Sequence, residues 1–196
     1  GVWIPHDGKG DPANIAMSLA KGAKNNGVEI FEDVKVTAIQ KENGVVTGVE
    51  TDQGNIKSAV VVNCGGMWAR DIGMMAGVNI PLHACEHYYA LTSPVENLGD
   101  MPTVRVPDEC AYYKEDAGKI LIEPDAKPWA QKGIPEDFCF DQIPDDLEHM
   151  MPYLEMAMNR LPILENVGLE TFFNGPESFT PDDNFHLGEC PELKNF

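Results

Sequence analysis

The segment at residues 59–71, AVVVNCGGMWARD, constrains the fold of this chain more than any other. Its first four residues are small, apolar and mostly β-branched, which predicts a strand buried on both faces. Small residues follow and predict an abrupt turn: Asn63, Cys64, Gly65 and Gly66. Helical spacing then places three side chains on one face: Trp68, Ile72 and Met75. Such a turn offers free backbone N–H groups to a ligand, and glycine allows a close approach. An ordinary strand-to-helix connection needs the same residues, so the pattern alone permits both interpretations.

The residues before this segment predict one helix and a meander of strands. Asp11 and Pro12 provide an N-cap followed by proline in the first turn, and the helix is expected to end near residues 25–27. Three strands are expected at residues 28–31, 34–40 and 45–51, the last two joined by a hairpin turn at residues 42–44. A helix, a meander and a buried strand in this order fit half of a nucleotide-binding α/β domain.

The character of the sequence changes near residue 77, where a second group of elements begins. Strands are expected at residues 80–92, 111–113, 120–122 and 168–173. A helix is expected over residues 145–158, with one apolar stripe: Leu147, Met151, Leu154 and Met158. Residues 123–143 are rich in proline and charge and predict an exposed excursion, and residues 175–182, GPESFTPD, predict a loop.

The composition excludes some classes of partner. The net charge is −18, from 14 basic and 32 acidic residues, whereas nucleic acids and anionic membranes require a basic surface. No apolar run approaches the roughly 20 residues of a membrane span. The five cysteines include no C-x-x-C pair, which is typical of reduced thiols: Cys64, Cys85, Cys110, Cys139 and Cys190. We therefore expect no nucleic-acid or membrane partner, and a location in the cytoplasm or, in a eukaryote, the mitochondrial matrix.

Two groups of side chains could carry chemistry. His83, Cys85 and His87 alternate along one expected strand and could in principle hold zinc. The rise of a strand, however, separates alternate residues by roughly 6.5–7 Å, which is awkward for three ligands of one ion, so we expect no metal site. The runs HYY, from His87, and YY, from Tyr112, could instead line a small polar pocket or simply be structural tyrosines of a sheet. The carboxylate pairs at Asp145 and Asp182 are interpreted as solvated caps.

The order of several motifs resembles one known family. The motifs are GVWIPHDGKGDP, VTAIQKENGVVTGVETDQGNI, VVVNCGGMWARDIG, PLHACEHYYALT, MPTVRVPDECAYY and GPESFTPD. Together they span nearly the whole chain and resemble the FAD-dependent amine oxidoreductases of the D-amino-acid oxidase superfamily, most closely its dimethylglycine and sarcosine dehydrogenase branch.

The resemblance implies a fold of two kinds of domain. Residues 1–77 would be part of a split, Rossmann-like FAD-binding domain, residues 78–167 a mixed-sheet substrate-binding domain, and residues 168–196 a return to the FAD-binding domain. The family's G-x-G-x-x-G turn is absent from these 196 residues, and both ends look cut. We therefore interpret the chain as an internal fragment that alone binds FAD weakly or not at all and is inactive.

The resemblance also implies roles for individual residues. Positions that meet FAD would be Val36, at its adenine end, and, along the dinucleotide, Cys64, Gly65, Gly66 and Trp68. His87 and Tyr112 match the two positions that face the substrate beside the flavin. Arg105 aligns with a family arginine that meets either the substrate carboxylate or a structural partner.

The implied reaction oxidises the C–N bond of a secondary or tertiary N-methyl amino acid. A hydride equivalent passes from the carbon beside the nitrogen to the flavin, and water or a folate carrier takes up the resulting iminium. His87 would help to keep the amine neutral, as a proton acceptor or a hydrogen-bond partner. Alternatives are another flavin dehydrogenase of this superfamily acting on a hydroxy acid or amino acid, or a non-catalytic remnant. An exposed apolar sheet edge near residues 60–62 could drive self-association.

Overall fold

The computed structural model describes residues 1–99, 101–124, 138 and 143–196, so Cys139 and most of the expected excursion lie outside the described residues. The chain divides into two compact units, one made of residues 1–63, 72–78 and 188–196 and the other of residues 64–71 and 79–187. Each unit has its own buried side chains. The division into FAD-binding and substrate-binding parts at residues 77 and 167 stays a prediction.

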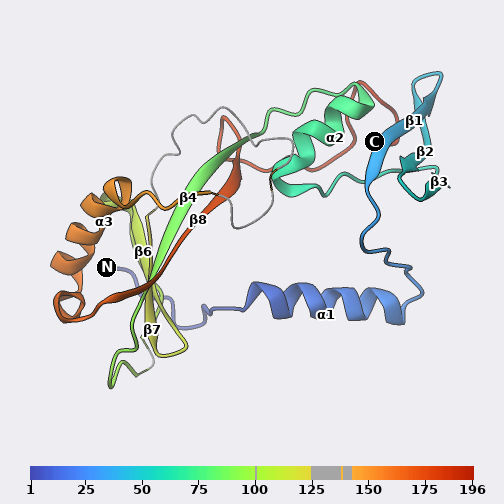
Figure 1. Ribbon diagram of the computed structural model, residues 1–196. Helices are drawn as coiled ribbons and strands as arrows, with labels where there is room; N and C mark the ends of the chain where they lie inside the picture. The colour runs from blue at the N-terminus through green and yellow to red at the C-terminus, as the bar shows by residue number, and fades with distance from the viewer. Residues whose placement is uncertain (100, 125–137, 139–142) are drawn as a thin grey trace. The chain divides into compact units, whose positions relative to one another are not determined.

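The first helix, α1 (Pro12–Asn25), begins and ends where the sequence predicts (Figure 1). The Asp11 carboxylate accepts a hydrogen bond from the backbone N–H of Asn14 at 2.7 Å, and Gly27 follows the helix with φ +85°. These are the capping interactions that the Asp-Pro start and the glycine end favour. No side chain of α1 is buried, and Ile15 and Leu19 of its apolar face are 53% and 70% exposed.

Two expected strands of the first unit do not form. Residues 28–31 and 59–62 have no strand pairing, and Val60 and Val62 are 55% and 76% exposed. A strand needs a neighbouring strand for its backbone hydrogen bonds, and no described strand pairs with either segment. The prediction of a strand buried on both faces at residues 59–62 is therefore wrong for this structure. The apolar side chains are exposed there, but not as a sheet edge, and self-association through them stays a prediction.

The meander forms as expected. β1 (Val36–Glu42), β2 (Val45–Thr51) and β3 (Gly54–Lys57) make an antiparallel three-stranded sheet in that order. Asn43 and Gly44 connect β1 to β2 with φ +50° and +77°, which are the left-handed angles of a two-residue hairpin. The side chains buried in this unit are few: Ile39, Val46, Ala76, Val78, Leu193 and Phe196.

The helix after the glycine turn starts later than the sequence predicts. A short 3-10 turn, η1 (Gly66–Trp68), comes first, and α2 (Ala69–Ala76) follows it. The buried residues of α2 are Gly73 and Ala76, whereas Trp68 and Met75 of the expected stripe are 37% and 38% exposed. The prediction of a stripe centred on the large side chains is wrong because the small residues of α2 are the ones that pack.

The second unit is a five-stranded sheet with the order β5-β6-β7-β4-β8, in which every neighbouring pair is antiparallel. Its strands are β4 (His83–Thr92), β5 (Val104–Val106), β6 (Ala111–Asp116), β7 (Lys119–Pro124) and β8 (Leu169–Phe179). The short 3-10 turns η2 (Pro107–Glu109) and η3 (Pro162–Asn166) lie outside the sheet. The expected strands are present, and β6 and β7 extend beyond their predicted cores.

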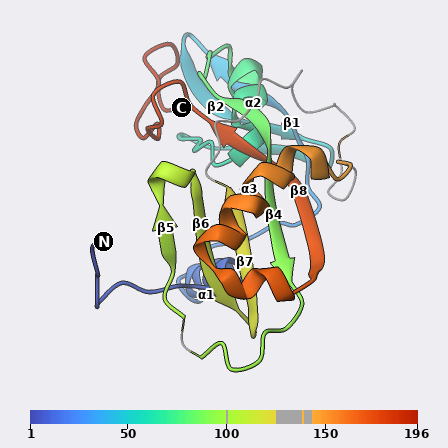
Figure 2. The same cartoon turned by 90° about the vertical axis from the view of Figure 1, so that its left-hand side faces the viewer.

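One helix, α3 (Leu147–Arg160), lies across one face of this sheet (Figure 2). Asp146 caps it by accepting a hydrogen bond from the N–H of His149, as expected for a solvated cap. The core lies between the helix and the sheet, and its most buried members are Tyr88, Ala90, Ala111, Tyr113, Ile120, Ile122, Met150 and Ala157. The other face of the sheet, opposite α3, is here called the site face.

The stripe of α3 is rotated from the predicted one. Leu147 and Met151 are 52% and 47% exposed, whereas Met150 and Ala157 are fully buried. Leu154 and Met158 pack against the core as predicted. Residues 150, 154, 157 and 158 have helical spacing as good as that of the predicted stripe, so periodicity alone does not separate the two.

The last strand continues through the motif that predicts a loop. β8 runs to Phe179 and pairs residue by residue with β4, with Gly175 opposite His87 and Pro176 opposite Glu86. A proline lacks the N–H that a central strand needs, but β8 is an edge strand, where that loss is tolerated. The prediction of a loop at residues 175–179 is therefore wrong, and the correction places Glu177 within the sheet.

The adjacent methionines of α3 provide a direct test of this packing. Met150→Ala should lower the free energy of unfolding by about 2–5 kcal/mol, because it leaves a cavity in the core. Met151→Ala removes the same atoms from an exposed position and should change it by less than about 0.5 kcal/mol. Urea titration of both variants measures the difference, and equal losses would contradict the packing of α3.

Candidate functional site

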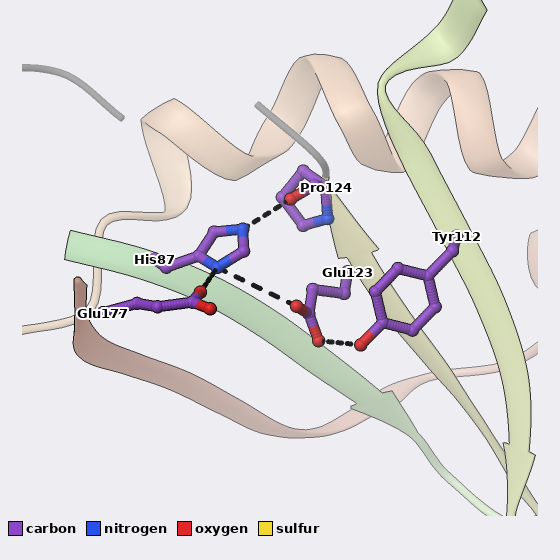
Figure 3. A network of polar contacts seen from close by, with 5 residues as sticks. All are labelled: His87, Tyr112, Glu123, Pro124 and Glu177. Carbon is purple, nitrogen blue, oxygen red and sulfur yellow. Dashed lines mark hydrogen bonds and ion pairs between the residues drawn. The ribbon is translucent and has the colours of Figure 1, made fainter. Parts of the chain in front are cut away.

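His87 is the centre of a polar cluster on the site face. Along β4 the side chains of Tyr88 and Ala90 point into the core under α3, so His87 and Tyr89 point to the other face. The Nδ1 atom of His87 contacts a carboxylate oxygen of Glu177, and its Nε2 atom lies 2.7 Å from the carbonyl oxygen of Pro124 (Figure 3). Both ring nitrogens of His87 therefore face hydrogen-bond acceptors.

Tyr112 joins the same cluster through Glu123. The register of β6 and β7 places Tyr112 opposite Glu123, and the tyrosine hydroxyl donates a hydrogen bond to one carboxylate oxygen. The other carboxylate oxygen of Glu123 lies 3.8 Å from His87 Nδ1. The four side chains thus form one row across β6, β7, β4 and β8, which Figure 3 shows in the order Tyr112, Glu123, His87 and Glu177.

The row is polar, but its surroundings are partly apolar. The side chains of His87 and Glu123 are 18% and 20% exposed, and that of Glu177 is 56% exposed. The ring of Phe179 meets the His87 ring edge to face at 5.9 Å, and Tyr89 stacks on Phe173 at 4.9 Å. This setting strengthens the charge interactions within the row relative to those in bulk water.

The ionisation of these groups is shifted in opposite directions. The hydrogen bond to Glu177 raises the pKa of His87 above its ordinary 6.5, against the opposing effect of burial, and the Pro124 carbonyl adds to the increase. The hydrogen bond from His87 lowers the pKa of Glu177 below 4.5. Burial, and then the hydrogen bond to Glu123, raise the pKa of the Tyr112 hydroxyl, so that this group stays neutral. The pair of His87 and Glu177 therefore stabilises the fold most between pH 4.5 and pH 6.5, the ordinary pKa values of the two groups. This contribution is lost as pH rises through the folded-state pKa of His87.

The structure brings together the two residues predicted to face a substrate, His87 and Tyr112. It does not gather the alternative zinc ligands His83, Cys85 and His87 into one group. Within the described part of the chain, the one group of three potential metal ligands is His87, Glu123 and Glu177, whose ligand atoms lie within 4.8 Å of one another.

Sequence reasoning missed Glu123 and Glu177. Glu123 directly follows the predicted strand at residues 120–122. A predicted strand that was one residue longer would have included Glu123 and placed it beside Tyr112. Glu177 lies in the motif interpreted as a loop. The signal that could have found it is the alternation of Phe173, Gly175, Glu177 and Phe179, which places these positions on one face of an extended strand.

Arg105 lies opposite Tyr112 in the register of β5 and β6. Its positive charge favours the ionised form of that tyrosine, so it opposes the larger effects that raise the pKa of Tyr112. Arg105 therefore lies at the end of the polar row.

The glycine turn is exposed rather than packed into a core. Cys64 and Gly66 are exposed, Gly66 has φ +55°, and a side-chain carbon built there would meet no atom within 4 Å. The following turn, η1, lies beside β4 and β8 of the same unit. The open space around this backbone fits the approach of a dinucleotide. Val36, in the other unit, is half-buried at the start of β1 and pairs with Thr51.

An open cleft lies where β4 begins and β8 ends. Among the residues that line it are Arg70, His83, Phe179 and Pro181. The cleft therefore borders the stretch in which Glu177 and the ring of Phe179 approach His87. No helix in the described residues is both long enough and apolar enough to cross a bilayer.

Known proteins resemble this chain over its whole length. The family model described as "DAO: FAD dependent oxidoreductase" matches residues 1–196. The mitochondrial sarcosine dehydrogenase of Homo sapiens is 38% identical over 201 residues, which are 100% of this chain and 22% of that protein. The mitochondrial pyruvate dehydrogenase phosphatase regulatory subunit of Mus musculus is 35% identical over 202 residues, 100% of this chain and 23% of that protein.

A solved structure shares the fold. The crystal structure of L-proline dehydrogenase from P. horikoshii aligns with a TM-score of 0.86 and 27% identity, covering 98% of this chain and 50% of that one. The resemblance found in the motifs and the expected mixed α/β fold are confirmed. The chain spans less than a quarter of the two curated relatives named above.

Adjacent tyrosines of β6 allow a test of the polar row. Tyr112→Phe removes the hydroxyl that donates to Glu123 and should lower the free energy of unfolding by about 1–2 kcal/mol. Tyr113→Phe removes a buried hydroxyl that has no hydrogen-bond partner among the described residues, and it should leave stability unchanged or raise it by up to about 1 kcal/mol. Urea titration of both variants gives the comparison, and the reverse order of stabilities would contradict the geometry.

Proposed function

Because the chain belongs to the family of FAD-dependent oxidoreductases, we propose that it is an internal segment of an enzyme that oxidises the C–N bond of a secondary or tertiary N-methyl amino acid. The observation that carries the proposal is the row of Tyr112, Glu123, His87 and Glu177 on one sheet face of a chain 38% identical to a sarcosine dehydrogenase. Sarcosine and proline, the substrates in the names of two matched proteins, are both secondary amino acids.

The residues fall into two groups by proposed role. The residues that would hold FAD are Val36, Cys64, Gly65, Gly66 and Trp68. A bound FAD supplies the two-electron acceptor for the hydrogen on the carbon beside the amine nitrogen. His87 and Tyr112 would face that amine, and only the neutral amine has the lone pair that assists the loss of this hydrogen. The one-carbon unit would then pass to water or to a folate carrier.

Carboxylate oxygens suit an amine. Glu123 and Glu177 present carboxylate oxygens beside His87, and such oxygens accept strong hydrogen bonds from an ammonium group. A hydroxy acid, the substrate of the alternative flavin dehydrogenase, has no cationic group for these carboxylates. The whole protein would act in the cytoplasm or in the mitochondrial matrix, and the isolated segment would be inactive.

A second candidate is a regulatory protein without turnover. One relative, 35% identical over the whole of this chain, is named a regulatory subunit of a phosphatase. A protein of that kind could keep the fold without oxidising an amine. The polar row favours the enzyme, because a half-buried histidine with a shifted pKa beside two carboxylates is more typical of a functional site than of a purely structural sheet.

The full-length protein should show a flavin absorption spectrum. Sarcosine or dimethylglycine, added without oxygen, should bleach that spectrum, whereas glycolate and malate should leave it unchanged, because they have no amine group for the carboxylates of the row. Bleaching by a hydroxy acid alone would favour the alternative dehydrogenase. A protein without flavin, or with a flavin that none of these compounds reduces, would favour the regulatory candidate.

His87→Gln should slow reduction of the flavin by the amine about 100-fold, because it removes the ring that joins Glu123 and Glu177; this is the lower end of the effect of losing one positioned hydrogen-bond donor in an active site. His149→Gln is the matched control, since His149 lies on α3 against Tyr88, on the opposite face of the sheet. It should leave the reduction rate unchanged. Stopped-flow absorbance across pH measures both variants, and an unaltered rate and pH profile in His87→Gln would remove this residue from the site.

A further inference from the structure

The surroundings of His87 fix the direction of the hydrogen bonds in the row. A backbone carbonyl can only accept, so the Nε2 atom facing Pro124 must carry a proton. An ionised carboxylate can also only accept, so the Nδ1 atom facing Glu177 must carry one as well. With both nitrogens protonated, the ring is a cation and has no lone pair with which to take a proton.

The neighbouring charges agree with this state. Among the described residues, Glu177 on β8 and Glu123 on β7 are the two carboxylates that face His87, and the Glu123 oxygen lies 3.8 Å from Nδ1. The other titratable groups of the row are the neutral hydroxyl of Tyr112 on β6 and the Arg105 guanidinium on β5, and Tyr89 follows on β4. The two near carboxylates outweigh the more distant arginine, and the raised pKa of His87 has the same sign.

The direction of the bonds continues to Tyr112. Glu123, beside the histidine cation, accepts a hydrogen bond from the Tyr112 hydroxyl. Because this hydroxyl donates to Glu123, its oxygen can still accept a hydrogen bond from an N–H group.

We propose that Glu177 is a positioning residue that holds His87 as a proton donor on both ring nitrogens. His87 is then not the proton acceptor of the reaction, and the Tyr112 oxygen accepts the N–H hydrogen bond of a secondary amine substrate such as sarcosine. This proposal rests on the proposed function only in its last part. The state of His87 follows from the fold alone, whatever the enzyme oxidises.

The first test reads the ring nitrogens directly. Magic-angle-spinning NMR of the full-length protein with ¹⁵N-labelled histidine, in which His87→Gln identifies the signal, should find both nitrogens of His87 protonated at neutral pH. A neutral tautomer with one bare nitrogen would overturn the proposal. Because this measurement needs no turnover, it fails or succeeds independently of the proposed function.

The second test separates Glu177 from a general effect of removing a carboxylate. Glu177→Gln keeps an oxygen that can accept from Nδ1 but removes the charge, so the titration of His87 should move down toward 6.5. Glu170→Gln is the matched control on the same strand, since Glu170 pairs with Lys119 at 2.6 Å and does not contact His87. It should leave the His87 titration where it is, and equal shifts in both variants would contradict the assignment.

The third test concerns the amine. Tyr112→Phe should raise the KM for sarcosine about 10-fold, the effect of one lost hydrogen bond, and should lower kcat by a smaller factor. The pH at which the reduction rate rises should differ from the His87 pKa measured by NMR. Coincidence of these two pKa values would make His87 the proton acceptor and overturn the proposal.

Discussion

The pairing of β4 with β8 is the interaction on which the rest of the site depends. It runs from His83 opposite Phe179 to Thr92 opposite Leu169, and it passes through Pro176 because β8 is the edge of the sheet. A strand that ended at Phe173, as the sequence predicts, would leave Glu177 in a loop. The continuation places Glu177 on the same face as His87, one strand away. The greater length of β8 therefore brings Glu177 into contact with His87, and this contact defines the charge and the orientation of the imidazole ring.

The sequence predicted well the elements that depend on local chemistry. The Asp11-Pro12 helix start, the Asn43-Gly44 hairpin and the long strand of HYY are all present, because capping, left-handed turns and alternation act within a few residues. The failures share a different cause. A buried strand at residues 59–62 requires neighbouring strands that the described chain does not supply. The stripe of α3 was misplaced because two sets of residues have equal helical spacing, and tertiary packing selects between them.

The candidate site was predicted in part for the same reason. His87 and Tyr112 were identified from the family resemblance, and the sheet brings them to one face. Glu123 and Glu177 could not be assigned without knowing strand registers, since each acts on a residue of another strand. Once those registers are known, the donors and acceptors of the row can be assigned from elementary chemistry, because a carbonyl accepts and a carboxylate accepts. The glycine turn at Cys64, Gly65 and Gly66 is open to solvent, as a nucleotide site requires, while its contact with FAD stays a prediction.

The most direct test of the central claim is an experimental structure of the full-length protein with FAD and the substrate amine, determined at low temperature. The structure with a carboxylate ligand in which a thioether replaces the oxidisable amine serves as the comparison. The account predicts that the amine nitrogen lies within hydrogen-bond distance of the Tyr112 oxygen, while Glu177 remains bonded to Nδ1 of His87. An amine bound to His87 Nε2 in place of the Pro124 carbonyl, or a ligand on the α3 face of the sheet, would contradict it.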